Sequence, residues 1–234
     1  MLSKTFREVF MLRTLLSGQL DLRTAIVHIL ALLVIIFLIL PLHEWAHAFT
    51  ASLLGDKAIK QRGRLSLNPV DHIDPVGVVF MFIFGFGWAK PVPIDPRNFK
   101  NPKAGMAISA AAGPLSNILA ALVGFLVLYP VVLFAPSTEF VYYVRIFLEF
   151  YISCNVSLAV FNLVPFPPLD GSKILFAFLP DKAVNFFYQY QQIFAIVLFA
   201  VLWFGFLDVP LNFISNAVWN GLSQLAFLPY KLFM

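Results

Sequence analysis

The stretch LILPLHEWAHAFTASLLG, residues 38–55, ends the first long apolar run with two histidines and a glutamate. Ionisable groups are costly in the hydrocarbon of a membrane and usually functional. His43 and His47 are four positions apart, so on an α-helix they lie about one turn apart on nearly the same face. Glu44 lies beside them. This is the HExxH spacing, in which two imidazoles bind zinc and the glutamate acts as general base.

The composition predicts that the rest of the chain is also made of membrane helices. Of its 234 residues, 60% are hydrophobic and only 12% are charged, and the mean hydropathy is +0.85. We therefore expect an all-α polytopic membrane protein with about five to six transmembrane helices, since each needs roughly 20 apolar residues. The runs long enough, or nearly so, lie near residues 25–54, 105–135, 140–164, 188–208 and 210–230.

A different structure is expected near residues 58–100. The apolar run 76–88 is short and contains three glycines, which favours a segment that re-enters or lies at the membrane surface. The polar stretches on either side, 55–75 and 88–104, predict a hairpin and an extended proline-rich loop. This part of the chain is thus expected to contain a re-entrant or short β-containing segment.

Two histidines leave a catalytic zinc one protein ligand short, because such sites use three ligands and a water. A third ligand on the same helix is excluded, since Thr50 and Leu53 occupy the positions that the longer zinc motif gives to glycine and histidine. Asp170 is favoured because it follows a proline-rich turn directly after an apolar run. An ordinary Asp-Gly turn at the bilayer surface stays open for it. The other candidates are Asp56, Asp71, His72, Asp74, Asp95 and Glu149.

Three motifs together resemble the signatures of the site-2 protease family of intramembrane zinc metalloproteases. They are HEWAH at 43–47, GPLSN at 113–117 and NLVPFPPLDG at 162–171. The stretches GRLSLNPVDHIDPVG at 63–77 and FGWAKPVPI at 86–94 resemble its compact prokaryotic branch, which carries no added regulatory domain. The resemblance runs from about residue 25 to residue 182.

The resemblance implies one zinc ion per chain, held by His43, His47 and Asp170, with Glu44 as the catalytic base. Asn117 would help to hold the substrate backbone or the developing oxyanion. The expected protein is a multi-pass protein of a prokaryotic cell membrane that cleaves transmembrane protein substrates, with the lipid bilayer as its other partner. Its expected parts are an amphipathic or interfacial segment 1–24, a metalloprotease core 25–182 and a C-terminal transmembrane hairpin 183–234.

Other function classes were weighed against this interpretation. A transporter that uses His43, Glu44, His47 and Asp170 as an ion site is the alternative, because intramembrane ionisable residues also mark ion pathways. A structural membrane protein is a third. Nucleic-acid binding is not expected although the net charge is +4, because the basic residues are dispersed between apolar runs. The single cysteine, Cys154, excludes an internal disulfide and a cysteine-rich zinc site.

The distribution of lysine and arginine predicts which face of the membrane the metal is near. Basic residues occur in 55–64, 88–104 and 173–182 and at Lys231, whereas the connection 136–140 has none. Lysine and arginine in short loops mark the cytoplasmic side. If 76–88 does not cross the membrane, the basic segments lie together there, and the active site faces the cytoplasm.

Overall fold

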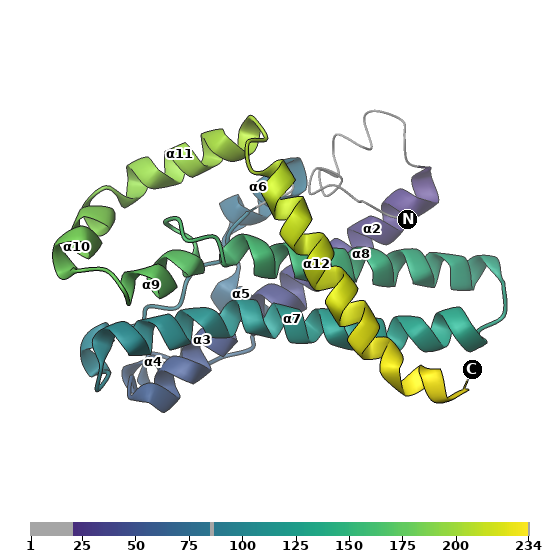
Figure 1. Ribbon diagram of the computed structural model, residues 1–234, viewed down its shortest axis with the longest axis horizontal. Helices are drawn as coiled ribbons and strands as arrows, with labels where there is room; N and C mark the ends of the chain where they lie inside the picture. The colour runs from purple at the N-terminus through teal and green to yellow at the C-terminus, as the bar shows by residue number, and fades with distance from the viewer. Residues whose placement is uncertain (1–20, 85–86, 234) are drawn as a thin grey trace.

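The computed structural model describes residues 21–84 and 87–233, and every regular element in these two ranges is a helix (Figure 1). The elements are α2 (Leu22–Val34), η2 (Ile35–Ile39), α3 (Leu40–Leu54), α4 (Ala58–Gln61), α5 (Pro69–His72), α6 (Pro75–Phe84), η3 (Pro96–Asn98), α7 (Pro102–Phe134), α8 (Glu139–Asn162), α9 (Asp170–Phe176), α10 (Asp181–Gln189), α11 (Gln191–Trp203), α12 (Asp208–Phe227) and η4 (Leu228–Phe233). The expected all-α class is confirmed for this part of the chain. The predicted N-terminal segment 1–24 lies mostly outside it.

The expected β-containing segment near 58–100 is not confirmed, because the described residues there form short helices and irregular extended chain. Hydrogen bonds from Arg64 and from one main-chain N–H hold this chain in place. The Arg64 guanidinium donates to the carbonyls of Lys90 and Pro91, each at 3.1 Å, and the Lys90 N–H donates to the carbonyl of His72 at 2.7 Å. Pro91 has no N–H to give to a ladder. Contacts between loop residues, not a strand ladder, therefore fix the position of this stretch.

The expected count of five to six transmembrane helices is not confirmed either. Three described helices are long and apolar enough to cross a membrane: Leu22–Leu54, α7 and α8. A fourth is possible if α10 and α11, which meet at a bend of 71°, form one broken span. The 20-residue α12 is long enough, but amide side chains recur along it and lower its hydropathy. The 10-residue α6 is too short to cross.

The first span is one helix with a π-helical segment in its middle. Asp21 caps its start by accepting hydrogen bonds from the N–H groups of Arg23 and Thr24. The π-turn η2 carries one extra residue, so the helix after it is rotated by about 100° relative to a straight α-helix. Pro41 follows at once, and its missing N–H suits a place where the regular ladder is already broken. The span ends at Gly55, whose φ is 128°.

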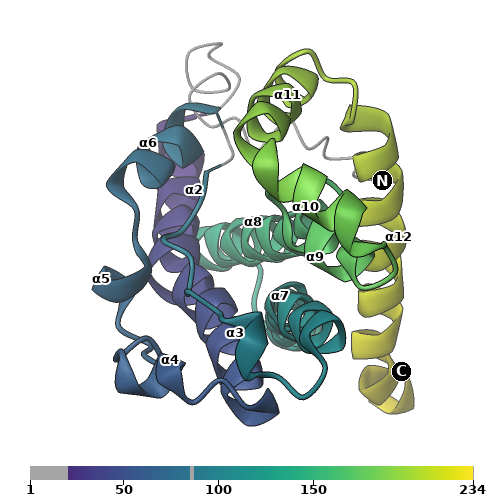
Figure 2. The same cartoon turned by 90° about the vertical axis from the view of Figure 1, so that its left-hand side faces the viewer.

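Helices α7 and α8 form the centre of the bundle. Figure 2 shows them between the α2–α3 helix on one side and α12 on the other, and α9 packs against α7 before α10 and α11 follow. Small residues let the helices approach closely, since a Cβ on Gly124 of α7 would lie 2.6 Å from the side chain of Ile152 on α8. The buried core on both faces of α8 consists of two hydrophobic clusters, one against α7 and α12 and one against α2 and η2.

Two ion pairs mark the opposite ends of this bundle. Arg23 pairs with Glu139, which joins the start of α2 to the start of α8. Lys103 at the start of α7 pairs with Asp181 of α10 at 2.8 Å, at the end that also holds α4 (Figure 1). The basic segments 55–64 and 95–103 therefore lie together, at the end away from the α7–α8 connection.

Lys231 was expected beside these basic segments, and the structure places it elsewhere. The hydroxyl of Tyr230 donates to the carbonyl of Leu126 at 3.0 Å, and its ring lies 5.9 Å from that of Tyr129. Both partners belong to the C-terminal half of α7. Helix α12 crosses α7 and α8 obliquely, so the C-terminus lies toward the end of the bundle that carries the α7–α8 connection (Figure 1).

Candidate metal centre

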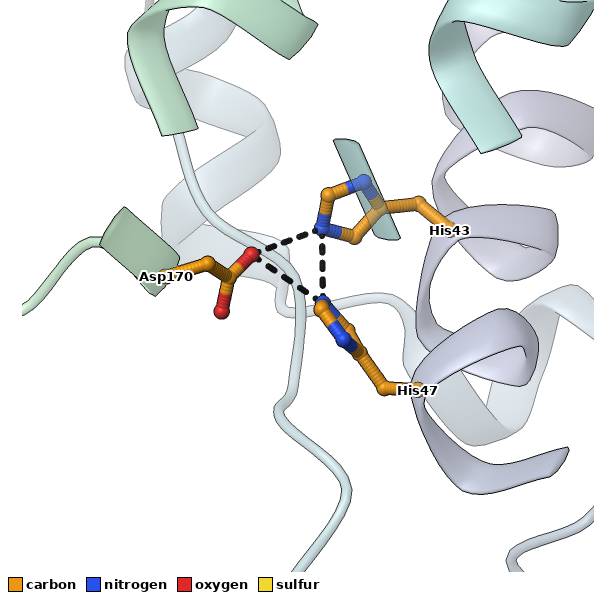
Figure 3. Close-up of side chains that lie close together, drawn as sticks. All are labelled: His43, His47 and Asp170. Atoms are coloured by element: carbon orange, nitrogen blue, oxygen red, sulfur yellow. Dashed lines mark hydrogen bonds and ion pairs between the residues drawn. The ribbon is translucent and has the colours of Figure 1, made fainter. Parts of the chain in front are cut away.

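The three predicted ligands His43, His47 and Asp170 meet at one point inside the bundle, although His43 and Asp170 are 127 positions apart in the sequence (Figure 3). The Nε2 atoms of His43 and His47 are 3.0 Å apart. Each also approaches the same carboxylate oxygen of Asp170, Oδ2, at 3.2 and 3.1 Å. All three side chains are buried. Within the described residues this is the only group of three histidine, cysteine or acidic side chains close enough to hold one metal ion.

The donor set fits zinc by distance and by chemistry. Ligand atoms about 2.0–2.1 Å from a tetrahedral zinc lie roughly 3.3 Å from one another, close to the 3.0–3.2 Å seen here. Two imidazole nitrogens and a carboxylate oxygen face one point, and each can present a lone pair there. The arrangement therefore fits one zinc ion, with room for a further non-protein ligand.

The other nitrogen of each imidazole is held by a hydrogen-bond acceptor from α7. The Nδ1 of His43 is 2.6 Å from the amide oxygen of Asn117, and the Nδ1 of His47 is 2.8 Å from the carbonyl oxygen of Ser109. Both acceptors require the proton on Nδ1. The Nε2 lone pair of each ring is then free for a metal.

Asn117 itself is part of a longer chain of amides. Its Nδ2 donates to the side-chain oxygen of Asn155 at 3.3 Å, and Asn155 donates to the carbonyl of Tyr151 at 2.9 Å. Asn117 and Asn155 are fully buried. Nδ1 and Nε2 lie on different sides of an imidazole ring, so Asn117 contacts His43 on the side away from the converging ligand atoms.

Gly113 leaves the space into which the two imidazoles reach. A Cβ at this position would lie 2.6 Å from Nε2 of His43 and even nearer to the ring of His47. Such contacts are far shorter than van der Waals separation, so a side chain here would displace the rings or fill the metal position. The glycine of the GPLSN motif thus serves the close approach of α7 to α3.

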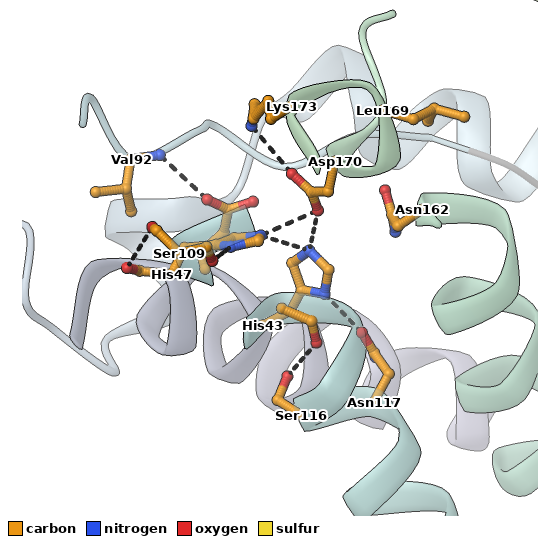
Figure 4. A network of polar contacts seen from close by, with 12 residues as sticks. His43, His47, Val92, Ser109, Ser116, Asn117, Asn162, Leu169, Asp170 and Lys173 are labelled. Atoms are coloured by element: carbon orange, nitrogen blue, oxygen red, sulfur yellow. Dashed lines mark hydrogen bonds and ion pairs between the residues drawn. The ribbon is translucent and has the colours of Figure 1, made fainter. Parts of the chain in front are cut away.

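Glu44 faces the same cavity as the three ligands. One oxygen of its carboxylate, Oε2, accepts a hydrogen bond from the N–H of Val92 at 3.1 Å (Figure 4). Val92 belongs to the extended stretch that follows α6. The carboxylate is therefore oriented by the main chain of a loop rather than by another charged side chain.

Asp170 is the first residue of α9 and is oriented by the turn before it and by a lysine after it. The Ser172 hydroxyl donates to the carbonyl of Leu169 at 2.6 Å, which tightens the start of the helix. The ammonium of Lys173 donates to Oδ1 of Asp170 at 3.0 Å, while Oδ2 faces the imidazoles.

The remaining third-ligand candidates lie away from the centre and have other partners. Buried Asp56 accepts from the N–H of Asp95 at 2.8 Å and from Asn98 at 2.7 Å, which ties the loop before α7 to the end of α3. The Nε2 of His72 contacts the carbonyl of Ser66 at 2.7 Å. Asp74 caps α6. Glu149 lines a separate cavity of about 40 Å³ between α8 and α12, and Asp71 is not in the metal group.

Sequence reasoning missed three contributors to this site. The carbonyl of Ser109 and the N–H of Val92 are main-chain groups, which any residue type supplies, so the sequence carried no signal for them. Lys173 did have a signal, because a residue three positions after Asp170 on a helix lies on the same face. The GPLSN motif pointed to Asn117, but the need for glycine at 113 follows only from how α7 packs on α3.

Comparison with known proteins shows which family the chain is similar to. A family model described as peptidase family M50 matches residues 130–205, which include Asp170. Over these residues the chain is similar to this family of peptidases. This match agrees with the resemblance of the chain to the site-2 proteases. The names of similar proteins include the words zinc metalloprotease, and the donor set of His43, His47 and Asp170 fits a zinc ion.

Two of these relatives illustrate the likeness. The Bacillus subtilis protein "Putative zinc metalloprotease YwhC" is 41% identical over 143 residues, which cover 59% of this chain and 64% of that protein. The Mycobacterium tuberculosis protein "Putative zinc metalloprotease Rip2" is 31% identical over 167 residues, covering 68% of this chain and 62% of that protein. The chain thus spans less than two thirds of the length of each. No solved structure matches the chain.

Proposed function

We propose that the protein is a zinc-dependent intramembrane endopeptidase that hydrolyses peptide bonds in or near transmembrane segments of membrane proteins. The observation that carries the proposal is the convergence of His43, His47 and Asp170 on one point, with Glu44 on the same cavity wall. This centre lies on a helix long and apolar enough to cross a membrane. The site residues are proposed in these roles, and the relatives' names support them.

The reaction is the addition of water to a peptide carbonyl and the breaking of the carbon–nitrogen bond. A bound zinc ion supplies a Lewis acid that polarises the carbonyl and lowers the pKa of water to about 7. Glu44 takes a proton from the attacking water and gives it to the leaving amine, so that the products are a carboxylate and an amine. The Val92 N–H holds the Glu44 carboxylate in place between these two transfers.

Asn117 and Ser109 are proposed as positioning residues. Their acceptors keep both imidazoles in the tautomer with a free Nε2 lone pair. This role for Asn117 replaces the oxyanion contact suggested by the family resemblance, because its amide lies behind the ring of His43. Lys173 holds the second oxygen of Asp170, which favours binding through one oxygen only.

The substrate backbone must leave its helix to be cut, since a helix hides each peptide bond in its own hydrogen bonds. We place the extended substrate beside the loop that contains Ala89, Pro91, Val92 and Ile94, because these residues line the cavity. The segment 63–68 does not line it.

A transporter is less well supported by this geometry. Imidazole nitrogens with a carboxylate suit a transition metal such as zinc better than an alkali or alkaline-earth cation, which prefers oxygen ligands. A glutamate on the cavity wall beside the ligands can act as a base in hydrolysis, whereas simple ion binding does not require it.

We further propose that the protein is a multi-pass protein of a prokaryotic cell membrane, with its active site toward the cytoplasm.

Two variants test the proposed division of roles. Glu44→Gln keeps the size of the side chain but cannot accept the proton of water, so the purified protein should retain zinc and lose cleavage of a transmembrane substrate. Asp170→Ala removes a ligand and should lose zinc itself. Metal analysis and a cleavage assay on both proteins are the measurements. Equal zinc loss in both would contradict the roles, and full activity of Asp170→Ala would exclude Asp170 from the site.

A further inference from the structure

The cavity that contains the metal centre continues past the ligands into the apolar interior. Its volume is about 340 Å³, within the range of roughly 300–1,000 Å³ that is typical of ligand-binding sites. One part of its wall is polar and carries the three ligands, Glu44 and Lys173. Apart from Ser157 and Asn162 of α8, the remaining wall from α2, η2, α6 and α8 is apolar, with the side chains of Leu32, Ile35, Met81, Cys154 and Leu158.

This apolar wall is part of the hydrophobic core. Leu32, Ile35, Met81 and Cys154 are each at most 5% exposed and belong to one buried cluster, against which Leu158 packs. None of these five side chains carries a charge. A polar or charged group placed among them would lose its hydrating water without gaining a hydrogen-bond partner, which costs roughly 2–7 kcal/mol. The chemistry of the wall therefore selects an apolar occupant.

We propose that this apolar part of the cavity is a specificity subsite for one large apolar side chain of the substrate, such as leucine, methionine or phenylalanine, next to the scissile bond. The inference rests on the proposed function and adds to it a preference that zinc chemistry alone does not supply. The peptide bond is positioned at the ligands, and the neighbouring side chain enters the apolar end of the same cavity.

Cys154 is the position from which this subsite can be altered. It has the smallest side chain of the five wall residues, so a larger residue there occupies space that the substrate side chain would otherwise fill. Cys154 is not one of the hydrogen-bond or ion-pair partners of His43, His47 or Asp170. Cys154→Leu is therefore expected to leave the metal centre intact while it shortens the subsite.

A matched control is available on the same helix. Val160 is buried like Cys154, but it packs in the other hydrophobic cluster and does not line the cavity. Val160→Leu also enlarges a buried side chain of α8, so it reports any general effect of overpacking. Zinc content measured on both variants shows whether the site has survived each substitution.

The first experiment compares transmembrane substrates that differ only in the residue on either side of the bond that is cut. For the wild-type protein, kcat/KM should be higher with phenylalanine or leucine than with alanine at one of these two positions. In Cys154→Leu this ratio should fall by roughly tenfold or more, as expected for a methylene-sized change in a hydrophobic pocket. It should not change in Val160→Leu. An unchanged ratio in zinc-loaded Cys154→Leu would overturn the proposal.

The second experiment needs no catalysis. A transmembrane peptide carrying photo-leucine at each position in turn is irradiated with the Glu44→Gln protein, and the cross-linked residues are identified by mass spectrometry. One peptide position should label the α2 and α8 wall at Leu32, Ile35 or Leu158, and this labelling should decrease when Cys154→Leu is added. Labelling confined to other helices would overturn the subsite even if the protein cleaves substrates. Labelling of the wall without any cleavage by the wild type would overturn the proposed function alone.

Discussion

At the scale of single residues, two glycines on long helices differ in what a methyl group would meet. Gly113 on α7 faces the imidazoles of His43 and His47, whereas a Cβ on Gly221 of α12 would have no atom within 4 Å. Gly113→Ala should therefore displace the imidazoles and lose most bound zinc. Gly221→Ala should keep zinc and raise the free energy of unfolding by about 0.5–1 kcal/mol, because alanine favours the helix.

Metal analysis and thermal unfolding of both glycine variants test this expectation. The pair separates a local steric effect from a general effect of alanine in a membrane helix. Full zinc occupancy in Gly113→Ala would show that the rings can move aside without losing the metal, and it would remove Gly113 from the account of the site.

Asn117 offers a second test at this scale, because its oxygen and its amide nitrogen have different partners. Asn117→Leu removes the acceptor for Nδ1 of His43, and zinc should bind roughly 10–100-fold more weakly. Asn117→Asp keeps an oxygen acceptor and should bind zinc nearly as the wild type does. Competition with a chelator measures both affinities. Wild-type affinity in Asn117→Leu, together with a loss of cleavage rate, would instead favour the oxyanion role.

At the scale of elements, the π-helical segment η2 sets the angle between the two halves of the first span. α2 packs against α8, and α3 packs against α7, so both halves are fixed by neighbours. Deletion of Phe37 from η2 would restore a regular helix and turn α3 by about 100° relative to α2. His43 and His47 would then no longer face Asp170, and zinc binding should be lost.

The matched control for this deletion is Phe37→Ala. Phe37 is 52% exposed, so the substitution removes its side chain with little loss of packing and keeps the extra residue of the π-turn. This variant should bind zinc normally. Equal zinc binding by the deletion and the substitution would mean that the span tolerates the missing residue and that the π-turn does not orient the ligands.

At the scale of the whole molecule, the gathering of basic segments at one end predicts the orientation in the membrane. Lys60 and Lys100 belong to that end, and Thr138, which caps α8, belongs to the opposite end. In a background with Cys154→Ala, single cysteines at these three positions should react with an impermeant thiol reagent from outside intact cells only at position 138. Lys60 and Lys100 should react only after permeabilisation.

The same labelling tests the short helix α6. Reaction from outside at 60 and 100 but not at 138 would reverse the proposed orientation. Reaction from outside at only one of positions 60 and 100 would mean that the segment 76–88 crosses the membrane. Either result would move the metal centre relative to the cytoplasm without changing its chemistry.

The sequence by itself determined the helical class, the membrane character and the pairing of His43 with His47, because these depend on composition and on helical periodicity. It also favoured Asp170, since the prolines before it end an apolar helix. These are local properties, which neighbouring residues decide. The expected β-containing segment near 58–100 is not confirmed, and Arg64 in this region donates to carbonyls 26 and 27 positions away, which neighbouring residues do not reveal.

Only the tertiary structure decided which groups complete the site. Ser109 and Val92 contribute main-chain atoms, which no residue type reveals. Gly113 is required because α7 packs against the imidazoles on α3, and the apolar subsite exists because α2, α6 and α8 leave space between them. Each of these features depends on contacts between segments far apart in the chain. Such contacts depend on how whole helices pack against one another, and the sequence pattern of a single helix does not predict them.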